Sequence, residues 1–186
     1  MNKLEVALIA LLIGWMLSQL TELIKSKYKI KKLKLAISLE LQDLEIHLDE
    51  SIKTAKKSAL EYGHNHNYTY SLNPPISTPV LDAFYCDVAD SFTVEQRYNI
   101  RVFRDNIRTY NSIVESLEKN SSGALTQNEI VFKLFEAYKK TAFAYIYIHE
   151  ANKVGGTVKI TNDHKAINKL RDELPALSEQ LAFKSY

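Results

Sequence analysis

Residues 4–24 read LEVALIALLIGWMLSQLTELI, and residues 25–34 read KSKYKIKKLK. No polar side chain occurs between Val6 and Leu17. As a helix, the 21 residues of the first stretch extend about 32 Å at about 1.5 Å per residue, enough for a hydrocarbon core of about 30 Å. The stretch therefore predicts a transmembrane anchor at residues 4–24, preceded by a short external tail at residues 1–3.

Lysine is concentrated directly after the anchor, in a segment that we call the collar (residues 25–34). Its six lysines are Lys25, Lys27, Lys29, Lys31, Lys32 and Lys34. Positively charged flanks resist translocation, so the collar predicts that the N-terminus is outside and the rest of the chain cytoplasmic, at the cell membrane (the inner membrane in a bacterium). The lysines can also attract anionic lipid, at about 1 kcal/mol each. A role in topology alone is the competing interpretation.

Two other interpretations of the apolar stretch fit the sequence less well. A cleaved signal peptide requires a basic start and a small-residue cleavage site, whereas residues 1–3 carry one lysine and residues 18–20 read SQL. An amphipathic helix lying in the membrane interface requires a polar face, and none exists between Val6 and Leu17. A true span is therefore the favoured prediction.

The charge of the chain is unevenly distributed. The whole chain holds 24 basic and 22 acidic residues. Residues 1–34 contain seven lysines and two glutamates, so residues 35–186 hold 17 basic and 20 acidic residues and a net charge of −3. A mildly acidic domain argues against general nucleic-acid binding, which depends on neutralising phosphates. Cys86 is the only cysteine, which excludes an internal disulfide and a cysteine-based zinc site and fits a reducing compartment.

Beyond the collar, apolar residues recur at intervals of three and four from Ile30 to Tyr62, and no Gly or Pro occurs between Gly14 and Gly63. This pattern predicts a long stem helix, either continuous with the anchor or bent at the collar. The outer face of the stem carries blocks of charge: Glu40, Asp43, Glu45, Asp49, Glu50, Lys53, Lys56 and Lys57. We interpret this face as solvated.

A loop at residues 63–77, rich in Asn and Pro, ends the stem. The alternating residues of 68–72 resemble those of 157–161, and the two runs are predicted to pair as a small β-ribbon. Thr78 precedes Pro79 in a pattern typical of a helix start.

Three longer helices are predicted after this short one. Capping boxes at residues 93–96 and 126–129 open two of them, and a third follows Asn162 or Asp163, with Pro175 expected to kink or split it. Each helix has one apolar stripe with the 3-4 spacing of a coiled coil. Such stripes are stable only when packed together, so residues 35–186 are predicted to form an all-α, antiparallel helical bundle.

The sharpest polar pattern is an arginine strip formed by Arg97, Arg101, Arg104 and Arg108. Their spacing places them on one side of a helix, about 120° from its apolar stripe. As a site, the strip would bind phosphate, anionic lipid headgroups or an acidic partner. As a structural feature, it would pair with acidic residues nearby, namely Asp82, Asp87, Asp90, Glu95 and Asp105. The acidic composition of the domain favours the structural interpretation.

Other candidate sites are weaker. His64 and His66 lie in a loop apart from His149 and His164, so we predict no metal site. Asn111 lies beside an apolar stripe, where an amide can fix helix register, although a boundary position explains it equally. The helix opened by residues 126–129 has more aromatic residues than one face can bury: Phe132, Phe135, Tyr138, Phe143, Tyr145 and Tyr147. The excess suits a partner or the membrane surface.

No catalytic or cofactor-binding motif is recognisable, so no catalytic residue and no cofactor is predicted. The leading hypothesis is a non-enzymatic, single-span membrane protein whose cytoplasmic bundle interacts with lipid and with a protein partner or further copies of itself. One alternative is a self-assembling effector that perturbs the bilayer, since Gly14 and Ser18 permit close helix approach. A third is an enzyme acting on a lipid or nucleotide through the arginine strip.

Overall fold

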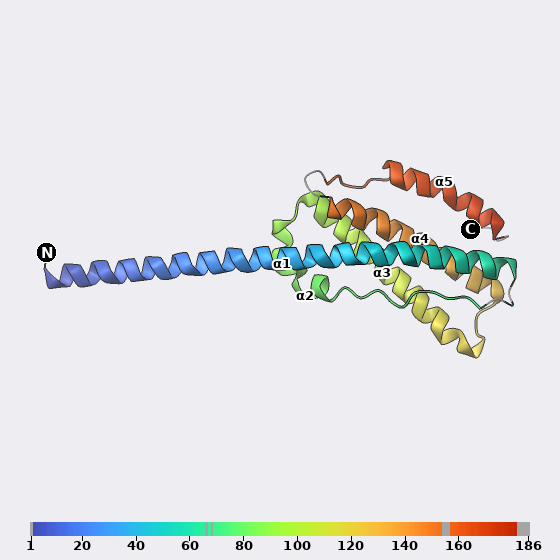
Figure 1. Ribbon diagram of the computed structural model, residues 1–186, viewed down its shortest axis with the longest axis horizontal. Coiled ribbons are helices and arrows are strands. Elements are labelled where there is room, and N and C mark those ends of the chain that lie inside the picture. Colours follow the sequence, from blue (N-terminus) through green and yellow to red (C-terminus); the bar gives the residue numbers. More distant parts are fainter. Residues whose placement is uncertain (1, 66, 68, 154–156, 182–186) are drawn as a thin grey trace.

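The computed structural model describes residues 2–65, 67, 69–153 and 157–181, and this part of the chain is helical and free of strands (Figure 1). The α-helices are α1 (Lys3–His64), α2 (Pro79–Val88), α3 (Val94–Glu118), α4 (Gln127–Asn152) and α5 (Lys165–Gln180), with short 3₁₀ helices η1 (Ala89–Ser91) and η2 (Lys119–Ser122). The predicted all-α helical bundle is confirmed.

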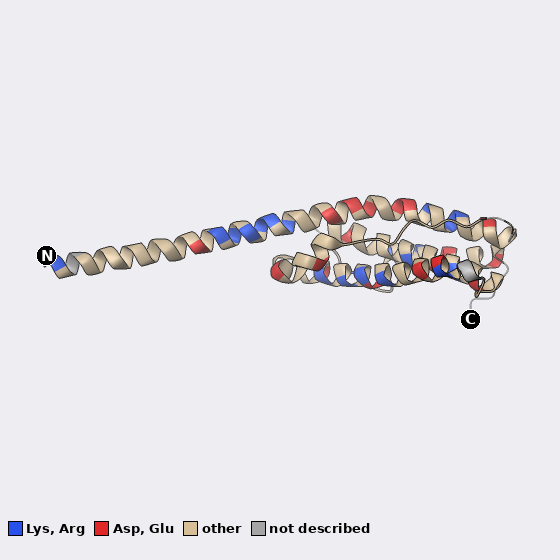
Figure 2. Cartoon of the chain, turned by 90° about the horizontal axis from the view of Figure 1, so that it is seen from below, with Lys and Arg blue, Asp and Glu red and all other residues tan. Residues whose placement is uncertain are grey.

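Helix α1 contains the anchor and the stem without interruption, so there is no break at the collar. Its first half projects away from the bundle (Figures 1 and 2), and the described side chains up to Lys32 are exposed. Its apolar N-terminal part is long enough to cross a membrane, and its most apolar 18-residue window has a mean hydropathy of 1.8 with no part buried. From Ile37 onward one face of α1 enters the core.

The core forms where α4 packs against both α1 and α3. One cluster, nearer the anchor, joins Ile37 and Leu48 of α1 to Phe103 of α3 and Ile148 of α4. A second cluster, at the far end, contains Tyr110, whose hydroxyl donates to the Asn73 carbonyl at 2.8 Å and whose burial raises its pKa to about 12. Helices α1 and α3 each run antiparallel to α4 (Figure 1), so both clusters combine residues that are distant in the sequence.

The predicted capping boxes are both present. Thr93 accepts from the Gln96 N–H while the Gln96 side chain accepts from Thr93, and Thr126 and Glu129 make the same exchange. Helix α2 begins after Thr78 as predicted, but it is capped differently. The two carboxylate oxygens of Glu40 accept from the backbone N–H groups of Val80 and Leu81, at 2.8 and 2.6 Å.

The predicted β-ribbon is wrong, because residues 69–72 and 157–161 form no strand; residue 68 lies outside the described part of the chain. Each run bonds to a helix instead. Ser71 exchanges hydrogen bonds with the Ser58 hydroxyl, and the Asn99 amide bonds Val158 and Ile160. These anchoring points lie at opposite ends of the bundle, so the two runs never meet.

The final helix follows Asp163 as predicted, and Pro175 does not split it. It begins at Lys165, with His164 as the N-cap, and continues past Pro175 to Gln180 without splitting. Proline removes the hydrogen bond to the carbonyl four residues earlier, which here belongs to Arg171. Arg171 and Pro175 are both exposed, so water can hydrate the freed carbonyl.

Glu40 is therefore expected to stabilise the junction of α1 and α2. Replacing it by Ala removes a charged cap from two N–H groups and should lower stability by about 1–2 kcal/mol, a decrease of roughly 2–8 °C in Tm. Thermal unfolding followed by circular dichroism in mild detergent measures this change. The matched control is Glu50→Ala, an exposed carboxylate on the same helix; equal effects of the two substitutions would contradict the capping role.

Candidate functional site

Two members of the arginine strip hold α3 against the segment before it. Arg97 forms an ion pair with Asp90 at 3.4 Å and also donates to the Ala89 carbonyl. Arg104 forms an ion pair with Asp82 of α2. Both contacts join residues of α3 to α2 and η1, so these two guanidinium groups have structural partners.

The other two members of the strip face outward. The Arg101 guanidinium lies 5.8 Å from the centre of the Tyr98 ring. The Arg108 side chain is 70% exposed, and its nearest carboxylate is Asp105 at 3.8 Å, one turn earlier on the same helix. Exposed pairs of this kind contribute little to stability, so both groups can bind an anion from outside the bundle.

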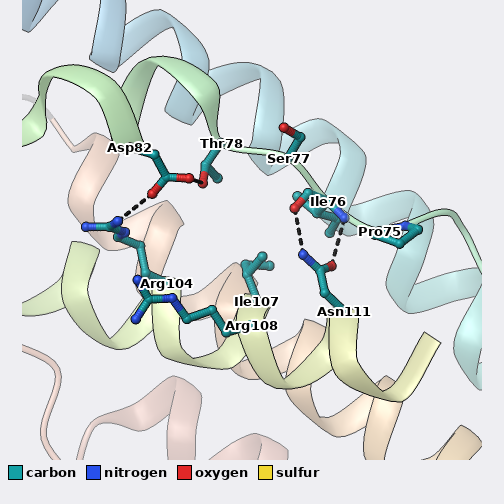
Figure 3. Close-up of a pocket in the computed structure, with 9 residues that line it drawn as sticks. All are labelled: Pro75, Ile76, Ser77, Thr78, Asp82, Arg104, Ile107, Arg108 and Asn111. Atoms are coloured by element: carbon teal, nitrogen blue, oxygen red, sulfur yellow. Dashed lines mark hydrogen bonds and ion pairs between the residues drawn. The ribbon is translucent and has the colours of Figure 1, made fainter. Parts of the chain in front are cut away.

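A cleft of about 480 Å³ opens beside the strip, between α3 and the loop that leads into α2 (Figure 3). Asp82 and Arg104 close one end, and Asn111 lies at the other. The Asn111 side chain accepts from the Ile76 N–H and donates to the Ile76 carbonyl, each at 2.8 Å. Asn111 therefore fixes the loop to α3, a role that its helical position alone did not reveal.

The stem also holds α4 through polar groups. Glu45 accepts from the Asn152 amide at 2.7 Å and bonds the His149 ring at 2.7 Å, and His149 in turn stacks on Tyr145. Together with the cap formed by Glu40, this overturns the interpretation of the outer stem charges as uniformly solvated. The two glutamates lie at the sides of the stem, where α2 and α4 pack.

The collar lysines also divide into one that contacts the bundle and five that are exposed. The Lys34 ammonium donates to the Ser91 carbonyl at 2.5 Å and lies 5.0 Å from the centre of the Phe92 ring, so it belongs to the bundle. The five preceding lysines are exposed: Lys25, Lys27, Lys29, Lys31 and Lys32. At 100° per residue they fall on two opposite sides of the helix, with Lys25, Lys29 and Lys32 on one side and Lys27 and Lys31 on the other.

Two of the described histidines bond to other parts of the fold. His149 bonds Glu45, and the His164 ring caps α5 by accepting from the Ala166 N–H; His66 lies outside the described residues. Among the residues that the structure describes, no group of three His, Cys, Asp or Glu side chains is placed to hold a metal ion.

Most of the aromatic surplus of α4 packs inside the bundle. Phe135 and Tyr138 are buried. Tyr145 and Tyr147 are half-buried, with Tyr147 lying against Tyr98 of α3. Phe132 is exposed and lines a shallow cleft under α5 with Leu174 and Pro175. The surplus is therefore largely explained by the three neighbours of α4, namely α1, α3 and α5.

No protein-family model, curated protein or solved structure matches the chain. The candidate site is therefore defined by its geometry: the outward pair Arg101 and Arg108, with the adjoining cleft. The sequence pattern located all four arginines. Which arginines form ion pairs with the preceding segment depends on where α2 packs, and no local sequence pattern predicts that position.

Glu150 is a buried carboxylate near the C-terminal end of α4. It accepts from the Lys153 ammonium at 2.5 Å and from the Val158 N–H at 3.0 Å. Burial alone raises the pKa of the Glu150 carboxyl, but these two donors stabilise its charged form and hold the pKa below its ordinary value. The contact joins α4 to the segment that follows it.

This arrangement predicts a loss of stability in acid. A carboxylate with a lowered folded-state pKa stabilises the fold above its ordinary pKa of about 4.3, and that contribution disappears as the pH falls through the folded-state value. Glu150→Gln should therefore lower Tm at pH 7, and the difference from the unmodified protein should shrink toward pH 3. Glu115→Gln, at an exposed pair with Lys119, is the control and should show no such trend.

Proposed function

We propose that the chain is a single-span membrane protein with its N-terminus outside, whose cytoplasmic helical bundle docks a protein partner at the membrane surface without catalysing a reaction. The observation that carries this proposal is the unbroken helix α1, which supplies both the apolar anchor and one wall of the bundle core. Eight residues separate the anchor from Leu33, where α1 begins to be covered. They span about 12 Å as a helix, so the bundle is held close to the bilayer.

The distribution of the collar lysines supports a helix that crosses the membrane. Lysines on opposite sides of a helix suit one that stands upright through the headgroup layer, because both sides then face lipid phosphates. A helix lying on the surface would concentrate its lysines on one face. The collar also supports the proposed orientation, since it is the more basic flank of the anchor.

The outward pair Arg101 and Arg108 supports an acidic segment of a protein as the ligand. The guanidinium groups can bind carboxylates bidentately, and the adjoining cleft can receive a side chain from the same partner. Two further polar side chains of the cleft are engaged in the fold: Asn111 with Ile76, and Thr78 with Asp82. Such a surface suits recognition better than chemistry.

The single cysteine provides a test of the orientation. Cys86 lies exposed on α2, within the bundle. A membrane-impermeant maleimide added to intact cells should leave Cys86 unlabelled, and labelling should appear only after the membrane is permeabilised. The converse control is Asn2→Cys in a Cys86→Ser background, which should be labelled in intact cells. Labelling of Cys86 without permeabilisation would place the bundle outside and refute the orientation.

The docking surface is tested by charge reversal. The double substitution Arg101→Glu and Arg108→Glu should reduce the recovery of a co-purifying partner at least tenfold, because two attractive contacts become repulsive. Tm should change little, since both side chains are exposed. The matched control is Lys119→Glu, which reverses an exposed cation at the far end of α3. Equal recovery with both variants would rule out the outward arginine pair as the docking site.

A further inference from the structure

The face of α1 that points away from the bundle carries large apolar side chains. Leu35 is 61% exposed, Leu39 52% and Ile46 65%. At 100° per residue the three lie within about 40° of one another. They lie opposite Ile37 and Leu48, which are fully buried. In Figure 2, α1 runs along one edge of the bundle and the other helices lie on one side of it.

These side chains belong to a regular seam. Positions spaced alternately by four and three residues extend from these side chains back into the anchor and forward into the second half of the stem. The members of this seam are Gly14, Ser18, Thr21, Lys25, Tyr28, Lys32, Leu35, Leu39, Gln42, Ile46, Asp49 and Lys53. A seam of alternating threes and fours is the pattern by which two helices pack in a coiled coil.

We propose that this seam packs against the same seam of a second copy of the chain, forming a parallel dimer. The inference rests on the membrane anchoring proposed above, because two copies anchored in one membrane in the same orientation must present their α1 helices in parallel. Each seam residue then faces its own counterpart at the same depth. A second copy thus places Leu35, Leu39 and Ile46 against the same three side chains and the anchor against the anchor.

The anchor part of the seam permits close approach. Gly14 and Ser18 form a small-xxx-small pair, and a Cβ atom placed on Gly14 would meet no atom within 4 Å. Helices in membranes associate through such small residues, because their backbones can come close together. The small pair in the anchor and the exposed aliphatic residues of the stem fall on one seam of alternating threes and fours.

The polar members of the seam suit a parallel pair. Gln42 lies between Leu39 and Ile46, where two facing amides can hydrogen-bond and fix the register, as buried polar residues do in coiled coils. Asp49 and Lys53 face their own counterparts in a parallel dimer, but each charge is already paired within its own chain, at 2.5 Å, which offsets the repulsion between like charges. Lys25 and Lys32 lie near the headgroups, where anionic phosphates offset their mutual repulsion.

The length of the apolar section explains why the anchor is needed. From Leu35 to Ile46 the seam covers less than two heptads, and a coiled coil of that length is marginal in solution. Anchoring both copies in one membrane raises their effective concentration and removes the competing antiparallel arrangement. The seam shares no residue with the arginine strip, so each copy keeps its docking surface free.

Cysteine cross-linking of the full-length chain tests the dimer. In a Cys86→Ser background, Gln42→Cys places a thiol on the seam, and His47→Cys places one at an exposed position 100° around the helix from Ile46. Carbonate-washed membranes treated with a mild oxidant should give a disulfide-linked dimer with Gln42→Cys, in at least tenfold greater yield than with His47→Cys. Equal yields, or no dimer with Gln42→Cys, would overturn the proposal.

A second variant and the carbonate wash distinguish failure of the dimer from failure of the membrane anchoring. Leu39→Glu with Ile46→Glu should convert the detergent-extracted complex from twice the chain mass to a single chain mass while leaving the circular dichroism spectrum unchanged, because both side chains are exposed within one copy. An unchanged dimer mass would refute the seam. Release of the protein by the carbonate wash would refute the anchoring and the parallel dimer together, whereas a membrane-bound protein without cross-links refutes the dimer alone.

Discussion

The structure depends on one constraint: α1 is a single helix that exposes apolar side chains on all sides along its first part and buries an apolar face on one side only along its second. An unbroken helix meets both demands because every backbone hydrogen bond stays within the segment. The change occurs between the collar and Ile37, the first fully buried residue of the stem. The remaining helices are arranged around the one-sided part, with α2 and α4 on its flanks.

Hydrophobic stripes alone do not determine how these helices are placed, because a stripe tolerates sliding and rotation. Specific polar groups remove that freedom. Glu40 caps α2, Asn99 bonds the segment at residues 157–161, and Asn111 bonds the loop at Ile76. Each of these groups pairs with backbone atoms that lack a partner in regular structure. Such contacts add modestly to net stability, but leaving any of those buried groups unpaired is costly, so they select one arrangement.

This explains which features the sequence could predict. The helices, the two capping boxes and the bundle follow from local periodicity and were found. The partners of Glu40, Glu45 and Lys34 are distant in the sequence, so these residues looked like ordinary surface charges. The β-ribbon was wrong for a related reason: its runs bond Ser58 and Asn99 at opposite ends of the bundle, a separation no local pattern encodes. In the arginine strip, the position of α2 alone distinguishes Arg104 from Arg108.

The unbroken helix also couples the rotation of the bundle to that of the anchor. A flexible linker would let the two parts turn independently. In a continuous helix, the number of residues between them fixes which face of the bundle lies on the same side as Gly14 of the anchor. Gly14 and Leu35 are three heptads apart, so in a straight helix their directions differ by about 60°, because 3.6 residues per turn exceeds the 3.5 of the heptad. A left-handed supercoil absorbs that angle. Pairing of two chains would therefore set the angle between their outward arginine pairs, and the geometry within the membrane would determine how a partner is presented with two docking surfaces.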